Sequence, residues 1–222
     1  MKHPIPDLAI TALAPRVRAE ARRQLEPVVG VQQTEAVASA AEREYGAIHS
    51  SLPESSTVGA SVMVHLAAMT LAYYKAVVSV GVESPRARCL VAKINWAVYE
   101  GLTSLPWALT RIGGDDALVR TKRAMDMFMV FPYASPGYEM EYVDTDEHVV
   151  GFDVRRCPVA EFFASYGLSE LCTEAFCDLD YPLADRWGVR LERRLTLATG
   201  GARCTFRFLR EDVGGGDDPE DA

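Results

Sequence analysis

The sequence lacks the closely spaced ligand pairs that mark most metal sites. Its five cysteines include no Cys-x-x-Cys pair, and its four histidines include no His-x-x-x-His pair. Basic residues are also in short supply, with 23 Lys and Arg against 31 Asp and Glu and a net charge of −8. Because binding to phosphates needs a concentrated basic face, we expect no nucleic-acid partner.

The sequence also lacks a clear export or membrane signal. Residues 1–7 contain no continuous apolar run of the kind found in a signal peptide. An odd number of unclustered cysteines disfavours a disulfide framework, so we expect reduced thiols in a cytoplasmic protein. The apolar stretch from Val58 to Val82 contains His65 and Lys75, which favours a buried helix in a bundle over a membrane span. We therefore expect no membrane partner.

What the sequence does have is a helical pattern in its front part. Hydrophobic residues make up 49% of the chain, enough for a sizeable core in 222 residues. Their spacing and the flanking Pro and Gly residues predict helices at about residues 8–25, 33–50, 58–82, 85–102 and 116–131, five in all, or six if Pro106 restarts the fourth. The part from about 8 to 131 should form a helical bundle.

Beyond Pro132 the apolar residues alternate, which predicts strands. Residues 138–143 and 148–154 should form one hairpin around an acidic turn. A second hairpin is predicted from Gly200-Gly201 as a two-residue turn, with Leu197 opposite Cys204 and Leu195 opposite Phe206. Cys204 then faces inward. The arginines of these strands face the other way: Arg190, Arg194, Arg203 and Arg207.

Together these patterns predict an α+β fold in a single domain, residues 1–213. The N-terminal helical bundle should pack on a four-stranded antiparallel sheet of two hairpins, which are joined by a helical segment. The mixed part covers about residues 132–211. Residues 214–222 have the composition of a disordered acidic tail.

The joining segment, Cys157 to Trp187, carries three of the cysteines. A continuous helix after Gly167 would place Cys172 on an apolar stripe, as a small buried residue away from any site. Cys177 would lie on a polar stripe that includes Glu170 and Asp180. That stripe is either solvated, with an incidental cysteine, or it lines a pocket. Cys89, in the run Cys-Leu-Val-Ala, should be a packing residue.

The order of the motifs in the last third of the chain resembles the L-2-amino-thiazoline-4-carboxylic acid hydrolase family. These motifs are Cys157-Pro158, Gly-x-x-Glu-Leu at 167–171, Cys-Asp-x-Asp at 177–180, and Arg-x-Thr-x-Ala-x-Gly-Gly-x-x-Cys-x-Phe-x-Phe at 194–208. The resemblance covers roughly residues 138–209. The family often has an acid directly after its last cysteine, where this chain has Thr205.

The resemblance implies a hydrolase-like enzyme for a small heterocyclic, thiazoline-type carboxylic acid or a related biosynthetic intermediate, acting by C–N/C–S ring opening or the reverse ring closure. Ring opening needs water or a nucleophile at the carbon between sulfur and nitrogen, and a proton for the leaving group. Cys177 is the candidate nucleophile, Asp178 or Asp180 the proton-transfer group, and Glu170 an alternative base. Acids beside a thiol raise its pKa, so a thiolate mechanism requires a nearby cation; otherwise a carboxylate would activate water.

Four further residues are candidates for substrate binding. Cys157 and Cys204 should converge with Cys177 around one cavity, while His65 and Arg194 could contribute charge. The same three thiols with an acid or His65 could instead bind a metal, but their wide spacing argues against it, and we expect neither metal nor cofactor. The alternative function is a non-catalytic small-molecule-binding domain. Formation of a homo-oligomer is left open.

Overall fold

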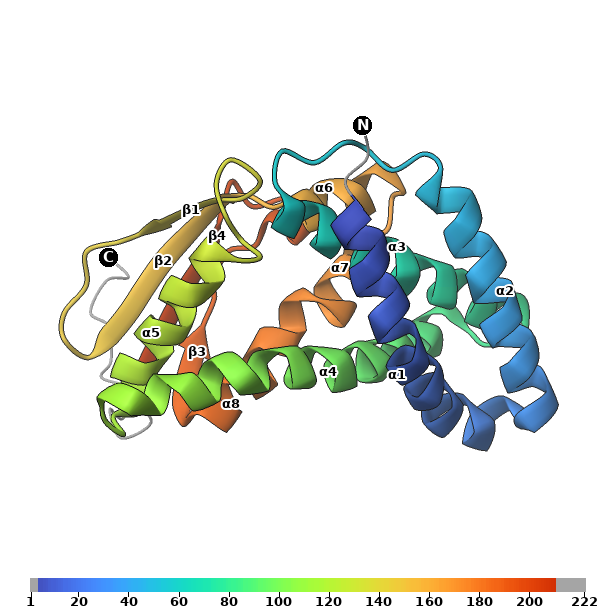
Figure 1. Cartoon of the computed structure of the whole chain (residues 1–222), viewed down its shortest axis with the longest axis horizontal. Helices are drawn as coiled ribbons and strands as arrows, with labels where there is room; N and C mark the ends of the chain where they lie inside the picture. The colour runs from blue at the N-terminus through green and yellow to red at the C-terminus, as the bar shows by residue number, and fades with distance from the viewer. Residues whose placement is uncertain (1–3, 211–222) are drawn as a thin grey trace, which may run out of the picture.

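The computed structural model describes residues 4–210 as a group of helices and a sheet that lie side by side along the long axis of the molecule (Figure 1). The first five helices are α1 (Pro4–Val29), α2 (Val31–His49), α3 (Val58–Ser79), α4 (Ser84–Leu109) and α5 (Ala117–Val130). All five predicted helices are confirmed. α1 and α4 are longer than expected. α1 extends beyond the predicted range at both ends, and α4 continues through Pro106 to a 3-10 turn, η1 (Thr110–Gly113).

Local sequence explains where these helices begin. The Thr57 side chain accepts a hydrogen bond from the backbone N–H of Ala60 at the start of α3, and Asp116 does the same for Val119 at the start of α5. Among the described residues, α3 is the one helix long and apolar enough to cross a membrane, and 78% of its apolar window is buried inside the protein. It is therefore the central helix of the bundle, as its composition predicted.

The sheet has four antiparallel strands, β1 (Glu139–Tyr142), β2 (Val149–Arg156), β3 (Val189–Glu192) and β4 (Cys204–Arg210), in the order β1-β2-β4-β3. The segment between β2 and β3 forms α6 (Pro158–Ser165), α7 (Ser169–Ala175), a 3-10 turn η2 (Cys177–Leu179) and α8 (Asp180–Trp187). The α+β architecture is thus confirmed, with a helical bundle and an antiparallel sheet joined by short helices.

The predicted register of the second hairpin is wrong. β3 ends at Glu192, Leu191 pairs with Phe208, and Leu197–Thr199 form a separate 3-10 turn, η3. Gly200 closes that turn with a φ of 88°, a conformation that glycine adopts readily. The backbone N–H of Leu197 therefore donates to the Cys204 sulfur at 3.2 Å instead of entering a ladder. Cys204 still faces inward and is 7% exposed.

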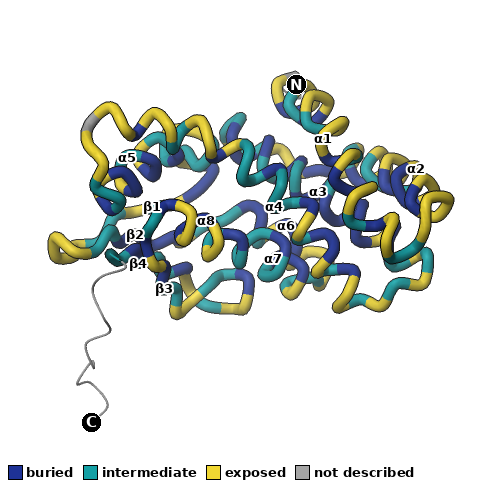
Figure 2. Tube along the Cα trace, turned by 90° about the horizontal axis from the view of Figure 1, so that it is seen from below, coloured by how far each residue is buried: buried dark blue, intermediate teal, exposed yellow. Residues whose placement is uncertain are grey.

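Two hydrophobic cores meet in the middle of the molecule. One lies inside the bundle and includes α6 and α7, and the other fills the space between the sheet, α5 and α8. Figure 2 shows buried segments running through both. Cys157, at the end of β2 and the start of α6, packs against both cores. We call the boundary between them the seam.

The segment after α5 is held against the start of α3 by close backbone contact. A Cβ atom added to Gly59 would lie 2.2 Å from the carbonyl oxygen of Pro132. Gly59→Ala should therefore lower the free energy of unfolding by about 1–3 kcal/mol, because the backbone must move to relieve the overlap. Urea unfolding followed by circular dichroism would measure this.

Gly46 provides the matched control, since it lies on α2 and a Cβ added there meets nothing within 4 Å. Gly46→Ala should raise stability by about 0.5–1 kcal/mol through helix propensity alone. Equal effects at the two positions would contradict the close contact at Gly59.

Candidate active site

Cys177 lies at a break between two helices. α7 ends at Ala175 because Phe176 adopts φ −133° and ψ −64°, and η2 begins at Cys177. The break turns Cys177 back toward the preceding helix, where the Cys172 thiol donates a hydrogen bond to the Cys177 sulfur. The expectation that Cys172 lies apart from the site is therefore wrong. The predicted continuous polar stripe does not form either, since the helix ends before it reaches Cys177.

Four thiols gather at the seam. The Thr196 hydroxyl lies 3.5 Å from the Cys204 sulfur and 4.0 Å from the Cys177 sulfur, so it links these two residues. Cys157 lies close enough to Cys177 and Cys204 for both to contribute to its raised pKa. The structure thus brings together Cys157, Cys177 and Cys204, as their predicted convergence requires. Cys89 lies elsewhere and is exposed, so its prediction as a packing residue is wrong.

A buried arginine, Arg193, is hydrogen-bonded to the 3-10 turn η2. The Arg193 side chain is 3% exposed and donates to the carbonyl oxygen of Cys177 at 2.7 Å. It also pairs with Asp180 at 3.0 Å and with Asp178 at 3.2 Å. A buried guanidinium paired on two sides is well fixed, and it places a positive charge beside the thiol cluster.

Asp180 is the acid most enclosed by this arrangement. Tyr99 of α4 donates to its second oxygen at 3.0 Å, and Tyr99 is in turn hydrogen-bonded to Tyr133. Burial raises the pKa of Asp180 to about 6, although Arg193 and Tyr99 favour its charged form. Asp178 also has a raised pKa through burial, but its side chain is 47% exposed. Asp180 is therefore better suited to exchange protons near neutral pH.

Of the four clustered thiols, Cys177 is the one that ionises most readily. The hydrogen bond from Cys172 lowers its pKa, and the Arg193 charge and the Thr196 hydroxyl act in the same direction against burial and Asp180. Donating that bond raises the pKa of Cys172. Burial raises the pKa of Cys157 to about 12 and also raises that of Cys204. The cation that a thiolate mechanism requires beside Cys177 is thus Arg193.

Three predicted site residues lie outside this cluster. Glu170 is 78% exposed and pairs with Arg88 of α4 at 3.0 Å, so it points to solvent and does not act as a base at Cys177 in this arrangement. His65 is buried on α3, where it bonds the Tyr45 hydroxyl and not the thiols. Arg194 follows β3 and is exposed.

Sequence reasoning missed Arg193, Thr196 and the tyrosines at 99 and 133. A signal for Arg193 did exist, because it occupies an inward position between Leu191 and Leu195 in an otherwise apolar alternation. A charge at such a position needs a buried partner. The tyrosines gave no comparable signal, since aromatic residues at helical or strand spacing usually serve a core.

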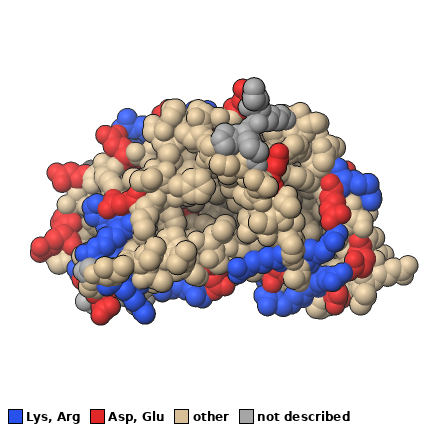
Figure 3. Space-filling view, viewed as in Figure 1, with Lys and Arg blue, Asp and Glu red and all other residues tan. Residues whose placement is uncertain are grey.

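The face of the molecule in Figure 3 is hollowed at its centre, in the region bordered by α4 and α5 in Figure 1. The visible walls of the hollow are mostly uncharged. α4 supplies Tyr99 and the segment after α5 supplies Tyr133, and both are half-buried. The hydrogen-bonded chain from Asp180 thus runs toward residues that still have exposed surface. A separate cleft of about 550 Å³ lies between the α1–α2 and α3–α4 turns and contains none of the cysteines.

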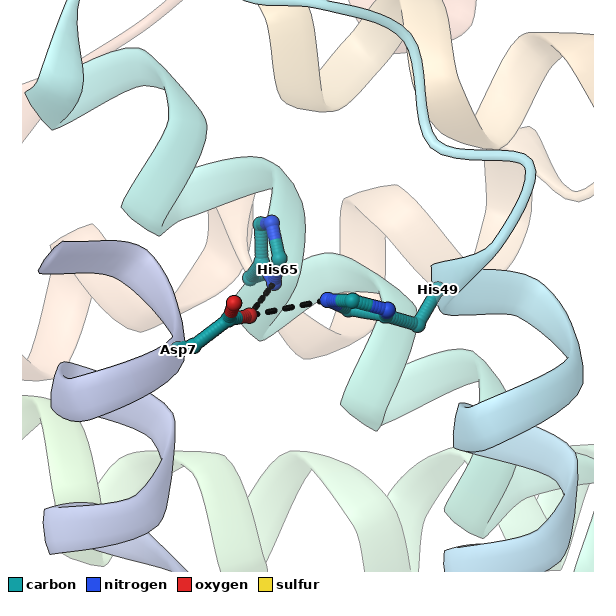
Figure 4. A group of neighbouring side chains, drawn as sticks. All are labelled: Asp7, His49 and His65. Atoms are coloured by element: carbon teal, nitrogen blue, oxygen red, sulfur yellow. Dashed lines mark hydrogen bonds and ion pairs between the residues drawn. The ribbon is translucent and has the colours of Figure 1, made fainter. Parts of the chain in front are cut away.

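The thiols do not form a metal-ligand group. Within residues 4–210, the group of ligand atoms close enough to hold an ion is Asp7, His49 and His65, whose atoms lie within 4.8 Å of one another. These residues come from α1, α2 and α3 (Figure 4). The groups at the seam include a thiol with a lowered pKa and a carboxyl with a raised pKa, which suit nucleophilic attack and proton transfer.

Comparison with known families covers the segments that form the seam. The sequence model of L-2-amino-thiazoline-4-carboxylic acid hydrolase matches residues 64–208, well over half of the chain. The chain belongs to this family. The family match includes all four thiols, Asp178, Asp180 and Arg193, and it leaves Asp7 and His49 outside. No curated protein and no solved structure matched the chain. The family name indicates a hydrolase for a thiazoline carboxylic acid.

Proposed function

We propose that the protein hydrolyses a thiazoline-type carboxylic acid, with Cys177 as the nucleophile and Asp180 as the proton-transfer group. The single observation that carries the proposal is the environment of the Cys177 sulfur, which receives a hydrogen bond from Cys172 and lies beside the buried Arg193. A lowered pKa makes a thiolate available without a histidine.

The first step opens the ring. The Cys177 thiolate attacks the carbon between the ring sulfur and nitrogen, and a new C–S bond forms to the protein. The bond from that carbon to the ring sulfur breaks, and the ring sulfur leaves with its electron pair. Protonated Asp180 gives its proton to the leaving sulfur, which becomes a free thiol. A carboxyl with a pKa of about 6 holds this proton in a useful fraction of molecules near neutral pH.

The second step releases the product. Ionised Asp180 takes a proton from water, whose oxygen attacks the carbon now attached to Cys177. The bond to Cys177 breaks, the thiolate is restored, and the product leaves as a carbamoyl compound that carries a free thiol. Over both steps one substrate molecule and one water molecule form one product. Cys177 is again a thiolate and Asp180 is again protonated. Tyr99 and Arg193 hold Asp180 in place through both steps.

Cys157 and Cys204 lie in the thiol cluster, and we propose that they contact the bound ring. Their raised pKa values keep them neutral, which suits apolar contact with a heterocycle. Arg194 stays a proposed partner for the substrate carboxylate, because it directly follows Arg193 in the chain. A binding domain without catalysis would need neither the lowered pKa of Cys177 nor the raised pKa of Asp180.

The direct test is to incubate the purified protein with L-2-amino-thiazoline-4-carboxylic acid and to follow the carbamoyl product by mass spectrometry. We expect turnover that requires Cys177. Saturable binding of this acid without turnover would favour the non-catalytic binding domain instead.

Alkylation by iodoacetamide would test the ionisation of Cys177. Cys89→Ser provides the working background, because the exposed Cys89 would otherwise dominate the reaction. The rate of Cys177 alkylation should rise with pH to a midpoint below that of an ordinary thiol, at about 8.5, because Cys172 and Arg193 favour the thiolate. Peptide mapping would identify the modified residue at each pH.

Cys172→Ala is the matched control, since it removes the donor and leaves Arg193 in place. The midpoint should then move to higher pH and the rate at pH 7 should fall. A midpoint that stays the same in this variant would contradict the hydrogen bond as a cause of the lowered pKa.

A further inference from the structure

A second cluster of chemically active side chains lies in the helical bundle, apart from the thiols. Asp7 in the first turns of α1, His49 at the end of α2 and His65 in the middle of α3 point toward one another (Figure 4). Two of these three residues lie outside the family match. The cluster is therefore not accounted for by the proposed hydrolase chemistry.

The three ligand atoms lie close enough together for side-chain rotation to form a small-cation site. One oxygen of Asp7 lies 2.8 Å from Nε2 of His49, a hydrogen-bond distance, and 3.9 Å from Nδ1 of His65. All three atoms lie within 4.8 Å of one another, and tetrahedral ligands at about 2.0 Å from a zinc ion are about 3.3 Å apart. Rotation of the three side chains would bring the atoms to that spacing.

A fourth donor atom, the Tyr45 hydroxyl oxygen, lies close to these three. The Tyr45 hydroxyl lies 2.8 Å from Nδ1 of His65. When a cation takes the Nδ1 lone pair of His65, this hydroxyl can turn to Asp7 or complete the coordination itself.

We propose that Asp7, His49 and His65 bind a divalent transition-metal ion that ties α1, α2 and α3 together. Two imidazoles and one carboxylate favour zinc or a neighbouring first-row metal, whereas magnesium and calcium prefer sites made only of oxygen. The exposed fraction rises from 11% for the His65 side chain to 31% for His49 and 53% for Asp7, so the site opens to solvent on one side. An ion can therefore enter without unfolding of the bundle.

Cobalt(II) and zinc(II) are suitable probes, because the thiols offer a competing site with a different signature. The full chain, freed of metal by a chelator, should bind one equivalent of cobalt with visible bands of a nitrogen and oxygen site and without a sulfur-to-cobalt charge-transfer band. Zinc at a hundredfold excess over its Kd should raise Tm by about 5–10 °C.

His49→Ala should weaken metal binding on the order of 100-fold and abolish the rise in Tm. The His49 side chain is only half-buried, so we expect the variant to fold, and circular dichroism would check this. Asp7→Asn should act in the same way. His148→Ala, at an exposed histidine that lies by Glu147 beyond β1, is the matched control and should bind as the wild type does. Unchanged binding in His49→Ala, a charge-transfer band that disappears in Cys177→Ser, or no binding by the wild type would each overturn the proposal.

Discussion

Cys177→Ser should lower kcat/KM for a thiazoline-type carboxylic acid on the order of 10³-fold or more. The expected loss is large because a serine hydroxyl keeps its proton under conditions in which the Cys177 thiol is partly ionised. Cys172 and Arg193 stabilise a thiolate, but they cannot ionise an alcohol. Of the histidines that the structure describes, His65 bonds Tyr45, His49 bonds Asp7 and His148 lies by Glu147, so none of these is placed to act as a base for serine. Initial rates measured by product formation would give the effect.

Cys172→Ser is the informative control for this experiment. A serine hydroxyl can still donate a hydrogen bond to Cys177, so this variant should keep activity within about tenfold of the wild type. Cys89→Ser should have no effect, because Cys89 is exposed and lies outside the cluster. If Cys177→Ser kept more than about a tenth of the wild-type rate, a covalent intermediate would be excluded, and water activated by Asp180 would be the remaining mechanism.

The bundle could be predicted from the sequence because its signals are local. Thr57 and Asp116 cap helices through hydrogen bonds to residues three positions away, and Pro85 occupies a first helical turn. The apolar pattern of α3 has few interruptions, which is typical of a helix surrounded by others. None of these features depends on what the helix packs against.

The second hairpin could not be predicted because Gly200-Gly201 suits two structures. The pair fits a two-residue hairpin turn, and it equally fits the end of a 3-10 turn. Hydrogen bonds from Gly201 to the Thr196 carbonyl and from Leu197 to the Cys204 sulfur select the second. The strands flanking the glycines gave the correct inward face for Cys204, since alternation survives a register shift of two residues.

The sequence predicted only some of the residues of the site, for a similar reason. Cys177 and Asp180 stand out because their motif is short and polar, whereas Cys172 joins them only through the helix break at Phe176. The position of Glu170 depends on its ion pair with Arg88, a residue of another helix. Contacts of this kind between distant segments decide which acid enters a site, and periodicity in one segment contains no information about them.

Asp180→Asn should lower kcat on the order of 10²-fold or more, because it removes the group that gives a proton to the leaving sulfur and later takes one from water. An amide of nearly the same volume can still accept from Tyr99 through its oxygen, but its NH2 group then faces Arg193, so urea unfolding must show that the variant is folded at assay temperature before the loss is assigned to chemistry. Asp178→Asn is the matched control, since Asp178 pairs with the same Arg193 but is 47% exposed. It should cost about tenfold or less.

The pH profile separates the chemical role of Asp180 from a structural one. In the wild type, the slope of kcat/KM against pH should decrease near pH 6, because Asp180 then begins to lose the proton that the leaving sulfur needs. In Asp180→Asn the change near pH 6 should be absent, and the remaining pH dependence should follow the ionisation of Cys177 alone. Rates at pH 5 to 8 for both proteins would test this. A change near pH 6 that persists in the variant would assign that ionisation to another group and leave Asp180 as a residue that only positions Arg193.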